Sequence, residues 1–330
     1  MKTLPNDLRS QYDLEIKKHY YDRSNFILDT NKGKYILRKM NISTEQILFM
    51  YDAVNHLRGN GFLQIGSIYP TKKNLPYSTS RGQIYVMQTY KDGKEVEFNE
   101  LADIKGSIKL LANFHKCGVG FETSLKNSQA IHIKDIYSYF SKRTRETHTL
   151  KKKITPLSQK TPFEIAFLKD YQDYEELQKM ALDCTSQTCC KNIMTNVQLT
   201  NSLAHNDFKY HAIRRMGDNY TLVHIDLCTY NMQVLDFSSI LIKIMQKNSW
   251  DTTLLHELIT IYETIRPLSD DEKAVLKAML IFPDKFATIC NNYLQCKRRN
   301  NYSMFAVKWD NMIEYKEEQI KAAHYIKENL

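Results

Sequence analysis

Alternating apolar and polar positions across the first hundred residues predict a small region rich in β-structure. Residues 25–30 and 34–40 have the pattern of two strands, and the turn between them, Asn31-Lys32-Gly33, contains residues that tolerate positive φ. Residues 83–90 are a third run of β-prone side chains, followed by the polar connection Lys91-Asp92-Gly93-Lys94. We therefore place the end of this region near Asp92.

One helix is predicted within the β-rich region. Ser43-Thr44-Glu45-Gln46 is a capping box, in which the first and last side chains satisfy backbone N–H groups at the start of a helix. Ile47 and Val54 then share one apolar face. This helix places Glu45 in its first turn.

Beyond Asp92 the hydrophobic period lengthens to that of helices. Apolar stripes and capping signals predict helices over residues 100–116, 134–153, 161–181, 237–247, 269–282, 284–296 and 301–330. His115 lies on one stripe, where a hydrogen-bonded core histidine is expected, and the aromatic stripe that begins at Phe163 is expected to be core as well. The fold class is therefore α+β, with a small β-rich N-terminal part and a larger, mainly helical C-terminal part.

The stretch from Leu203 to Leu227 carries the candidate chemistry. It has the pattern of a polar loop, a short strand, a turn at Gly217-Asp218-Asn219 and a second strand that ends on a carboxylate. Asp207 and Asp226 would thus emerge at one edge of a hairpin. This layout is typical of phosphoryl transfer, in which one Asp lies beside the attacking hydroxyl and another holds Mg²⁺ against the phosphates.

Several stretches of the sequence together carry a family resemblance. They are Gly33-Lys34-Tyr35-Ile36-Leu37-Arg38, residues 85–95, Leu111-Ala112-Asn113-Phe114-His115, the loop around Asp207, Val234-Leu235-Asp236 and Phe282-Pro283-Asp284-Lys285-Phe286. By their order and spacing the chain resembles the protein-kinase-like aminoglycoside and choline phosphotransferases, and within them the CotS-like spore coat family. The resemblance implies two lobes, residues 1–92 and residues 93–330, with the catalytic-type loop in the second.

The resemblance also implies roles for residues in and after the loop. His205 would brace the loop, Asp207 would orient or deprotonate an acceptor hydroxyl, and Asp226 would hold Mg²⁺. Asp236 would support the loop by accepting hydrogen bonds, with an ordinary helix N-cap as the alternative.

A nucleotide, where one binds, would meet residues of the first lobe. Arg38 stands where such enzymes have the lysine that touches phosphate, and Glu45 is its expected partner on the helix. The alternative is an exposed Arg38 and a Glu45 that only favours the helix start. Gln88, Thr89 and Tyr90 end the strand whose backbone would meet adenine.

Three departures weaken this site. Ala212 replaces the metal-binding asparagine five residues after Asp207, Arg38 replaces lysine, and residues 18–24 are bulky where a glycine-rich loop would admit phosphate. All three affect the same phosphates and metal, so their effects reinforce one another. The sequence favours weak or absent phosphotransferase activity with no cofactor, and the resemblance implies a structural or interaction role among other spore coat proteins.

Two alternatives remain open at this point. One is an active kinase that uses ATP and one Mg²⁺ through Asp226, with Asp207 as the base and a hydroxyl acceptor that the sequence does not name. The other is a regulatory protein that binds a nucleotide without turnover.

Composition limits the partners further. The 330 residues carry a formal charge of +9, but the basic residues are scattered, so no nucleic-acid surface is expected. The seven cysteines lack C-x-x-C spacing, which favours reduced thiols over zinc sites or disulfides. Cys184, Cys189 and Cys190 form a cluster that can cross-link in an oxidising assembly, although ordinary thiols explain it more simply. No signal peptide or membrane span is predicted, so we expect synthesis in the cytoplasm and, by the resemblance, a place in the spore coat.

Overall fold

The computed structural model describes residues 4–22, 24–123, 125, 135–296 and 302–330. Within it the chain forms two compact units. The first is built from Met1–His132 and Thr200–Gln233, and the second from Ile133–Leu199 and Val234–Leu330. This division groups the loop around Asp207 with the N-terminal strands. The predicted boundary between lobes near Asp92 is a different division, based on the family resemblance, and it stays a prediction.

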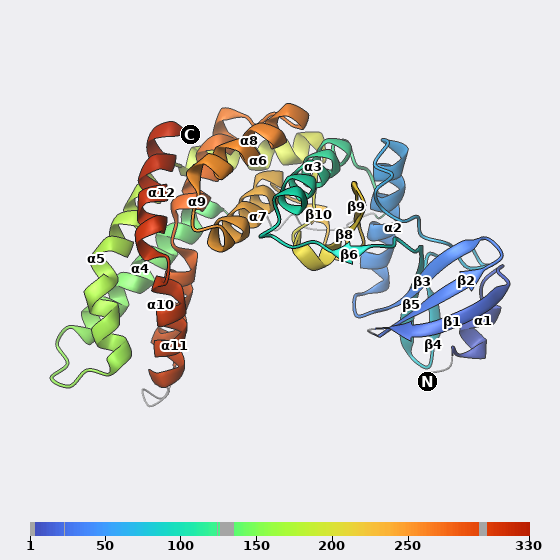
Figure 1. Cartoon of the computed structure of the whole chain (residues 1–330), viewed down its shortest axis with the longest axis horizontal. Helices are drawn as coiled ribbons and strands as arrows, with labels where there is room; N and C mark the ends of the chain where they lie inside the picture. The colour runs from blue at the N-terminus through green and yellow to red at the C-terminus, as the bar shows by residue number, and fades with distance from the viewer. Residues whose placement is uncertain (1–3, 23, 124, 126–134, 297–301) are drawn as a thin grey trace. The chain divides into compact units, whose positions relative to one another are not determined.

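A five-stranded antiparallel sheet forms the N-terminal part of the first unit (Figure 1). Its spatial order is β1-β2-β3-β5-β4, and its strands are β1 (Ile16–Asp22), β2 (Asn25–Thr30), β3 (Gly33–Met40), β4 (Ser78–Ser80) and β5 (Gln83–Thr89). The strands predicted at residues 25–30, 34–40 and 83–90 are confirmed. The sequence analysis missed β1, which pairs with β2 from Asp22 opposite Asn25 to Ile16 opposite Thr30.

The turn between β2 and β3 sets the register of the sheet. Gly33 has a φ of +114°, a conformation that glycine adopts without steric cost. The resulting pairs put Phe26 opposite Leu37 and Leu28 opposite Tyr35. All four of these side chains belong to the buried core of the sheet, so a shift of one residue would move them to the other face.

Helices α1 (Asn6–Ser10), α2 (Thr44–Gly59) and α3 (Leu101–Cys117) accompany this sheet in the first unit. The predicted capping box of α2 is confirmed: the Gln46 N–H donates to Ser43 Oγ at 3.2 Å, and the Ser43 N–H donates to Gln46 Oε1 at 3.0 Å. His115 of α3 is fully buried, as predicted for a core histidine.

Two small sheets complete the first unit. The strands β6 (Lys94–Glu95), β8 (Ile213–Met216) and β9 (Asn219–Leu222) form one, in the order β6-β8-β9, and β7 (Leu203–Ala204) pairs with β10 (Thr229–Tyr230) in the other. The predicted hairpin is therefore confirmed, but its second strand does not reach Asp226. It ends at Leu222 because the chain turns at Ile225, whose carbonyl accepts the Cys228 N–H at 3.1 Å.

The second unit is built from helices (Figure 1). They are α4 (Ile136–Ile154), α5 (Pro162–Asp183), α6 (Gln187–Thr200), α7 (Gln233–Lys247), α8 (Thr252–Ile265), α9 (Asp270–Ile281), α10 (Asp284–Gln295), α11 (Tyr302–Ile313) and α12 (Lys316–Asn329). The predicted aromatic stripe of α5 is core: Phe163, Phe167 and Tyr174 are buried, with their ring centroids 5.4, 6.0 and 6.3 Å from that of Trp309. None of the described helices combines the length and apolar character needed to cross a membrane.

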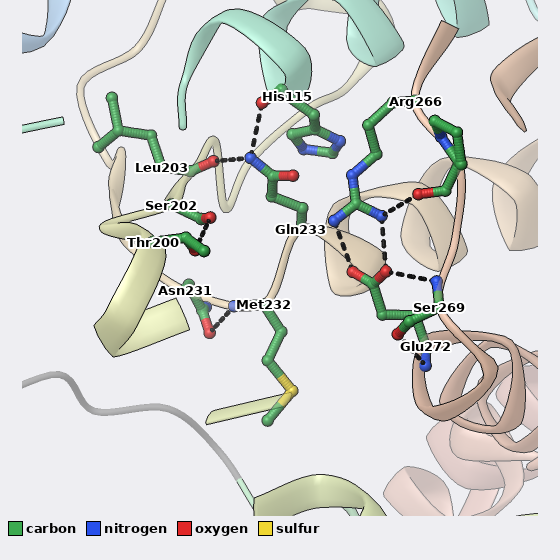
Figure 2. A network of polar contacts seen from close by, with 11 residues as sticks. His115, Thr200, Ser202, Leu203, Asn231, Met232, Gln233, Arg266, Ser269 and Glu272 are labelled. Atoms are coloured by element: carbon green, nitrogen blue, oxygen red, sulfur yellow. Dashed lines mark hydrogen bonds and ion pairs between the residues drawn. The ribbon is translucent and has the colours of Figure 1, made fainter. Parts of the chain in front are cut away.

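The start of α9 is held by a closed set of polar contacts (Figure 2). The Glu272 N–H donates to Ser269 Oγ at 3.2 Å, and the Ser269 N–H donates to Glu272 Oε2 at 3.0 Å. Arg266 forms a bidentate ion pair with the same carboxylate: Nη2 donates to Oε1 at 2.6 Å, and Nη1 donates to Oε2 at 2.8 Å. The capping box predicted at Ser269 is thus confirmed and reinforced by an arginine that the sequence analysis did not single out.

Two predictions for the helical part are wrong. The single closing helix expected at residues 301–330 is two helices, because the backbone leaves the helical conformation at Tyr315 and the next residue, Lys316, donates to the buried Asp170 at 2.9 Å. Asp236 does not cap a helix either. It lies in the first turn of α7, which already begins at Gln233, and its side chain is buried.

Candidate functional site

The loop that carries Asp207 is held at its start within the first unit. β7 and β10 pair Ala204 with Thr229 and Leu203 with Tyr230. Figure 2 shows the buried Gln233, whose Nε2 donates to the carbonyl oxygens of His115 at 2.8 Å and Leu203 at 2.9 Å. One side-chain amide therefore ties the end of α3 to the first residues of the loop.

His205 connects the loop to the segment that follows β9. Its Nδ1 accepts the Asp207 N–H at 3.2 Å, and its Nε2 lies 2.6 Å from the carbonyl oxygen of His224. Since Nδ1 accepts a hydrogen bond, the proton must be on Nε2, and the ring is the neutral tautomer that donates to His224. This geometry suits the bracing role expected for His205.

Asp207 lies in a small cluster of charged side chains. Lys209 forms an ion pair with Oδ1, and His211 Nε2 lies 3.8 Å from Oδ2. A carboxylate that orients a substrate hydroxyl must direct an oxygen toward it. Lys209 competes with such a hydroxyl for one of the two oxygens.

Ala212 is packed into the protein at the end of a short 3₁₀ turn, Tyr210–Ala212. Its N–H donates to the Lys209 carbonyl and its carbonyl accepts the Val223 N–H, both at 2.9 Å. The backbone thus keeps the conformation of the loop, while the methyl side chain offers no ligand to a metal.

The buried Arg38 of β3 forms an ion pair with Asp226, in which Nη2 donates to Oδ2. This contact differs from both expectations for Arg38, because the side chain is only 7% exposed and its partner is not Glu45. Glu45 is exposed in the first turn of α2. The second oxygen of Asp226, Oδ1, is buried and has no hydrogen-bond partner among the described residues.

A cavity of about 720 Å³ lies within the first unit, lined by residues of the five-stranded sheet and of the β6-β8-β9 sheet. It gathers Arg38, Gln88, Thr89 and Tyr90, which are four of the five residues expected to meet a nucleotide. Glu45, the fifth, is not in its wall. Neither Asp207 nor Asp226 lines this cavity.

The backbone at the adenine end of the cavity is already hydrogen-bonded. The N–H of Thr89 donates to Ser67 at 2.8 Å, and the N–H of Tyr90 donates to Lys34 at 2.9 Å. Gly66 allows the close contact on this side, because a Cβ there would fall 2.3 Å from the Thr89 carbonyl oxygen. A base stacked at this strand end would find these two donors occupied.

The cavity also contains charged or ionisable side chains that were not predicted as site residues: Asp22, Lys91, Lys94, Glu95, His211, Arg214 and His224. Arg214 Nη2 lies 3.3 Å from Glu95 Oε1 across the paired strands β8 and β6. Burial, followed by the positive charge of Arg38, lowers the pKa of His224 to about 4, so this ring is neutral at pH 7. For Lys94, Glu95 and Arg214 the only signal is the strand pairing, which brings residues 94–95 and 214–215 together.

The surroundings of Asp226 are unfavourable for a divalent metal. Mg²⁺ takes oxygen ligands in near-octahedral array, and the part of the chain that the structure describes holds no cluster of three or more His, Cys, Asp or Glu side chains suited to a metal. Mg²⁺ also binds through one carboxylate and phosphate oxygens, so this alone would not exclude it. Arg38 opposes a metal more directly, because its guanidinium pairs with Oδ2 of Asp226 and would repel a second cation there, which leaves only Oδ1 without a partner among the described residues.

The fold is that of the kinase-like phosphotransferases. An aminoglycoside phosphotransferase from Alicyclobacillus acidocaldarius matches with a TM-score of 0.82 at 17% identity, over 100% of this chain and 98% of that one. A spectinomycin phosphotransferase matches with a TM-score of 0.53 at 15% identity, over 98% and 97%. At these identities the likeness shows the fold alone.

The sequence comparisons identify one family within this fold. The family model described as "Spore coat putative kinase YutH" matches residues 5–325, so the chain belongs to this family. Spore coat protein S of Bacillus subtilis (strain 168) is 23% identical over 309 residues, which are 92% of this chain and 86% of that protein. The family and the fold expected from the sequence are thereby confirmed.

Proposed function

We propose that this chain is a kinase-fold spore coat protein with a degenerate phosphotransferase site, and that its role in the coat is structural, through contacts with other coat proteins. The single observation that carries the proposal is the ion pair between Arg38 and Asp226. In an active site of this fold, that carboxylate holds the metal that neutralises the phosphates. Here an internal cation neutralises the carboxylate instead.

Three further observations support a site without turnover. Ala212 lacks a metal ligand, Lys209 holds one oxygen of Asp207, and Asp22 places a carboxylate in the cavity wall beside the tip of the β1-β2 hairpin. A negative charge at the tip of this hairpin repels the phosphates that a glycine-rich loop would cradle. Ala212 and Asp22 oppose the binding of a metal–triphosphate complex, and Lys209 opposes the orientation of an acceptor hydroxyl by Asp207.

The place in the spore coat rests on the family and on the likeness to spore coat protein S. A chain that acts by assembly needs its folded surface and not its catalytic groups. We therefore infer that cytoplasmic synthesis is followed by incorporation into the coat, and that this incorporation is independent of Asp207 and Asp226.

An active phosphotransferase is the second candidate. The braced loop around His205 and Asp207 favours it, as does the cavity that contains Gln88, Thr89 and Tyr90. In that case ATP and Mg²⁺ would be the cofactors and an alcohol group the acceptor.

Two measurements separate the candidates. Transfer of labelled phosphate from ATP with Mg²⁺ to hydroxyl acceptors should be undetectable, and a fluorescent fusion produced in a sporulating bacterium should reach the coat. The matched control is the Asp207→Asn/Asp226→Asn fusion, which should reach the coat equally well. Turnover that disappears in this double variant, or a fusion that needs the two carboxylates to assemble, would overturn the proposal.

A further inference from the structure

The side chain of Arg38 has an ion-pair partner, and the residue also lines the cavity. Its Nη2 donates to Asp226, which does not line the cavity. Among the described residues, Asp226 is the only one to which the guanidinium of Arg38 donates. A guanidinium has five N–H donors in a planar fork, so donors remain for a group in the cavity.

The charges around the cavity favour an anion at this place. Arg214 is compensated by Glu95 at 3.3 Å, whereas Lys91 and Lys94 line the wall without an ion-pair partner among the described side chains. Arg38 lines the cavity, whereas its partner Asp226 does not. Asp22 is the one acidic side chain of the lining without a cationic partner in the described chain.

We infer that Arg38 is a built-in cation that takes the place of a divalent metal at Asp226, and that the cavity binds a compact phosphate-type oxyanion without any metal. This inference rests on the proposed degeneracy of the site. Arg38 supplies the bidentate donor pair that matches two oxygens of a phosphate, and Lys94 supplies a second, more flexible cation.

The same geometry disfavours a nucleotide as the occupant. Adenine would need backbone donors that Thr89 and Tyr90 already use. A diphosphate or a small phosphate ester does not depend on these donors. The apolar side chains Ile36 and Leu222 in the wall can accommodate a short hydrocarbon part of such an ester.

Inorganic pyrophosphate is a suitable probe. Its binding to the full chain is measured by isothermal titration calorimetry in the presence of EDTA. We expect binding without metal, and a loss of affinity of about tenfold or more in the Arg38→Gln/Asp226→Asn variant, because a charged hydrogen-bonding group is removed. The double change leaves no unpaired buried charge, so the variant should fold.

Lys39→Gln is the matched control. Lys39 is the next residue of β3, and its exposed side chain lies on the opposite face of the strand, so its removal takes away one positive charge outside the cavity. Its affinity for pyrophosphate should change by less than about twofold. Absence of binding in EDTA, binding that appears only with Mg²⁺, or equal affinity in the Arg38→Gln/Asp226→Asn variant would each overturn the inference. A failure of the proposed function would show separately, as phosphate transfer from ATP.

Discussion

Gly106 of α3 lies directly against the ring of Tyr220 in β9. A Cβ at position 106 would fall 2.2 Å from the Cζ atom of that ring. The ring has little freedom to withdraw, because its hydroxyl donates to the Ala102 carbonyl at 2.8 Å. The helix and the hairpin that precedes Asp226 are therefore packed together through a position that only glycine fits.

Gly106→Ala should destabilise the protein although alanine favours a helix. The helix propensity gains about 1 kcal/mol, whereas overpacking against a held ring costs about 1 to 3 kcal/mol. We expect a lower free energy of unfolding in urea. Gly59→Ala is the control, since a Cβ at the end of α2 meets no atom within 4 Å. Equal unfolding midpoints for the two variants would show that Tyr220 moves aside.

The ion pair between Arg38 and Asp226 should contribute to stability as a pair. Asp226 is 28% exposed, so we expect a coupling free energy of about 1 to 2 kcal/mol, below that of a fully buried pair. A double-mutant cycle with Arg38→Gln and Asp226→Asn measures it from urea unfolding. Strictly additive effects of the two changes would mean that the two groups do not interact in solution.

Asp236 and Asp207 should differ in their effect on stability. Asp236 is 5% exposed, and Asp236→Ala should cost about 1 to 3 kcal/mol because it leaves buried donors without an acceptor. The side chain of Asp207 is 29% exposed and paired with the exposed Lys209, so Asp207→Ala should cost less than about 1 kcal/mol. Thermal unfolding of the two variants compares them. Unchanged midpoints in both would remove the supporting role of Asp236.

ATP with Mg²⁺ should not produce a large thermal shift. A ligand at about 100 times its dissociation constant stabilises the native state by about 2.7 kcal/mol, and we expect no comparable effect at millimolar nucleotide. Ala212→Asn alone should not create a fast kinase, since Arg38 still occupies Asp226. A strong shift that requires Mg²⁺ and is lost in Asp226→Ala would instead favour the active phosphotransferase.

The thiols should fall into two classes of reactivity. None of the seven cysteines, which all lie in the described part of the chain, forms a disulfide: Cys117, Cys184 and Cys296 are partly exposed, and Cys189, Cys190, Cys228 and Cys290 are buried. Burial raises the pKa of Cys189 to about 11, so at pH 8 it is almost entirely the unreactive thiol. Iodoacetamide should label the first group in the native protein and the second only after unfolding. Early labelling of Cys189 would restore the cross-linking hypothesis for the cluster at Cys184, Cys189 and Cys190.

The sequence predicted those elements whose start or turn depends on local chemistry. The capping boxes at Ser43, Thr161 and Ser269 satisfy backbone groups within four residues, and each is present in the structure. Strand β1 forms a tight hairpin with β2 but is mostly exposed, so it lacks the apolar alternation that marks a strand. The break at Tyr315 depends instead on a distant partner, Asp170. Local pattern carries no information about such partners.

The residues of the candidate site show the same difference between local and distant determinants. The loop residues His205 and Asp207 were recognised from their own neighbourhood, and the missing metal ligand at Ala212 from its spacing. The partner of Arg38 is 188 residues away in sequence, and the expectation that it would be Glu45 came from a family whose lysine it replaces. Only the folded structure shows that Arg38 pairs with Asp226, the carboxylate that was expected to hold the metal.

The first unit is assembled from two stretches of chain with a helical segment between them. During synthesis the five-stranded sheet can form early, because all of its strands precede residue 90. Strand β6 and the face of α3 around Gly106 cannot pack until later, because their partners β8 and Tyr220 are translated only after the intervening helices. A nascent chain that has not yet passed Asp226 therefore leaves Arg38 without its carboxylate partner. It also exposes an unpaired strand edge and an apolar helix face, which are features that chaperones bind.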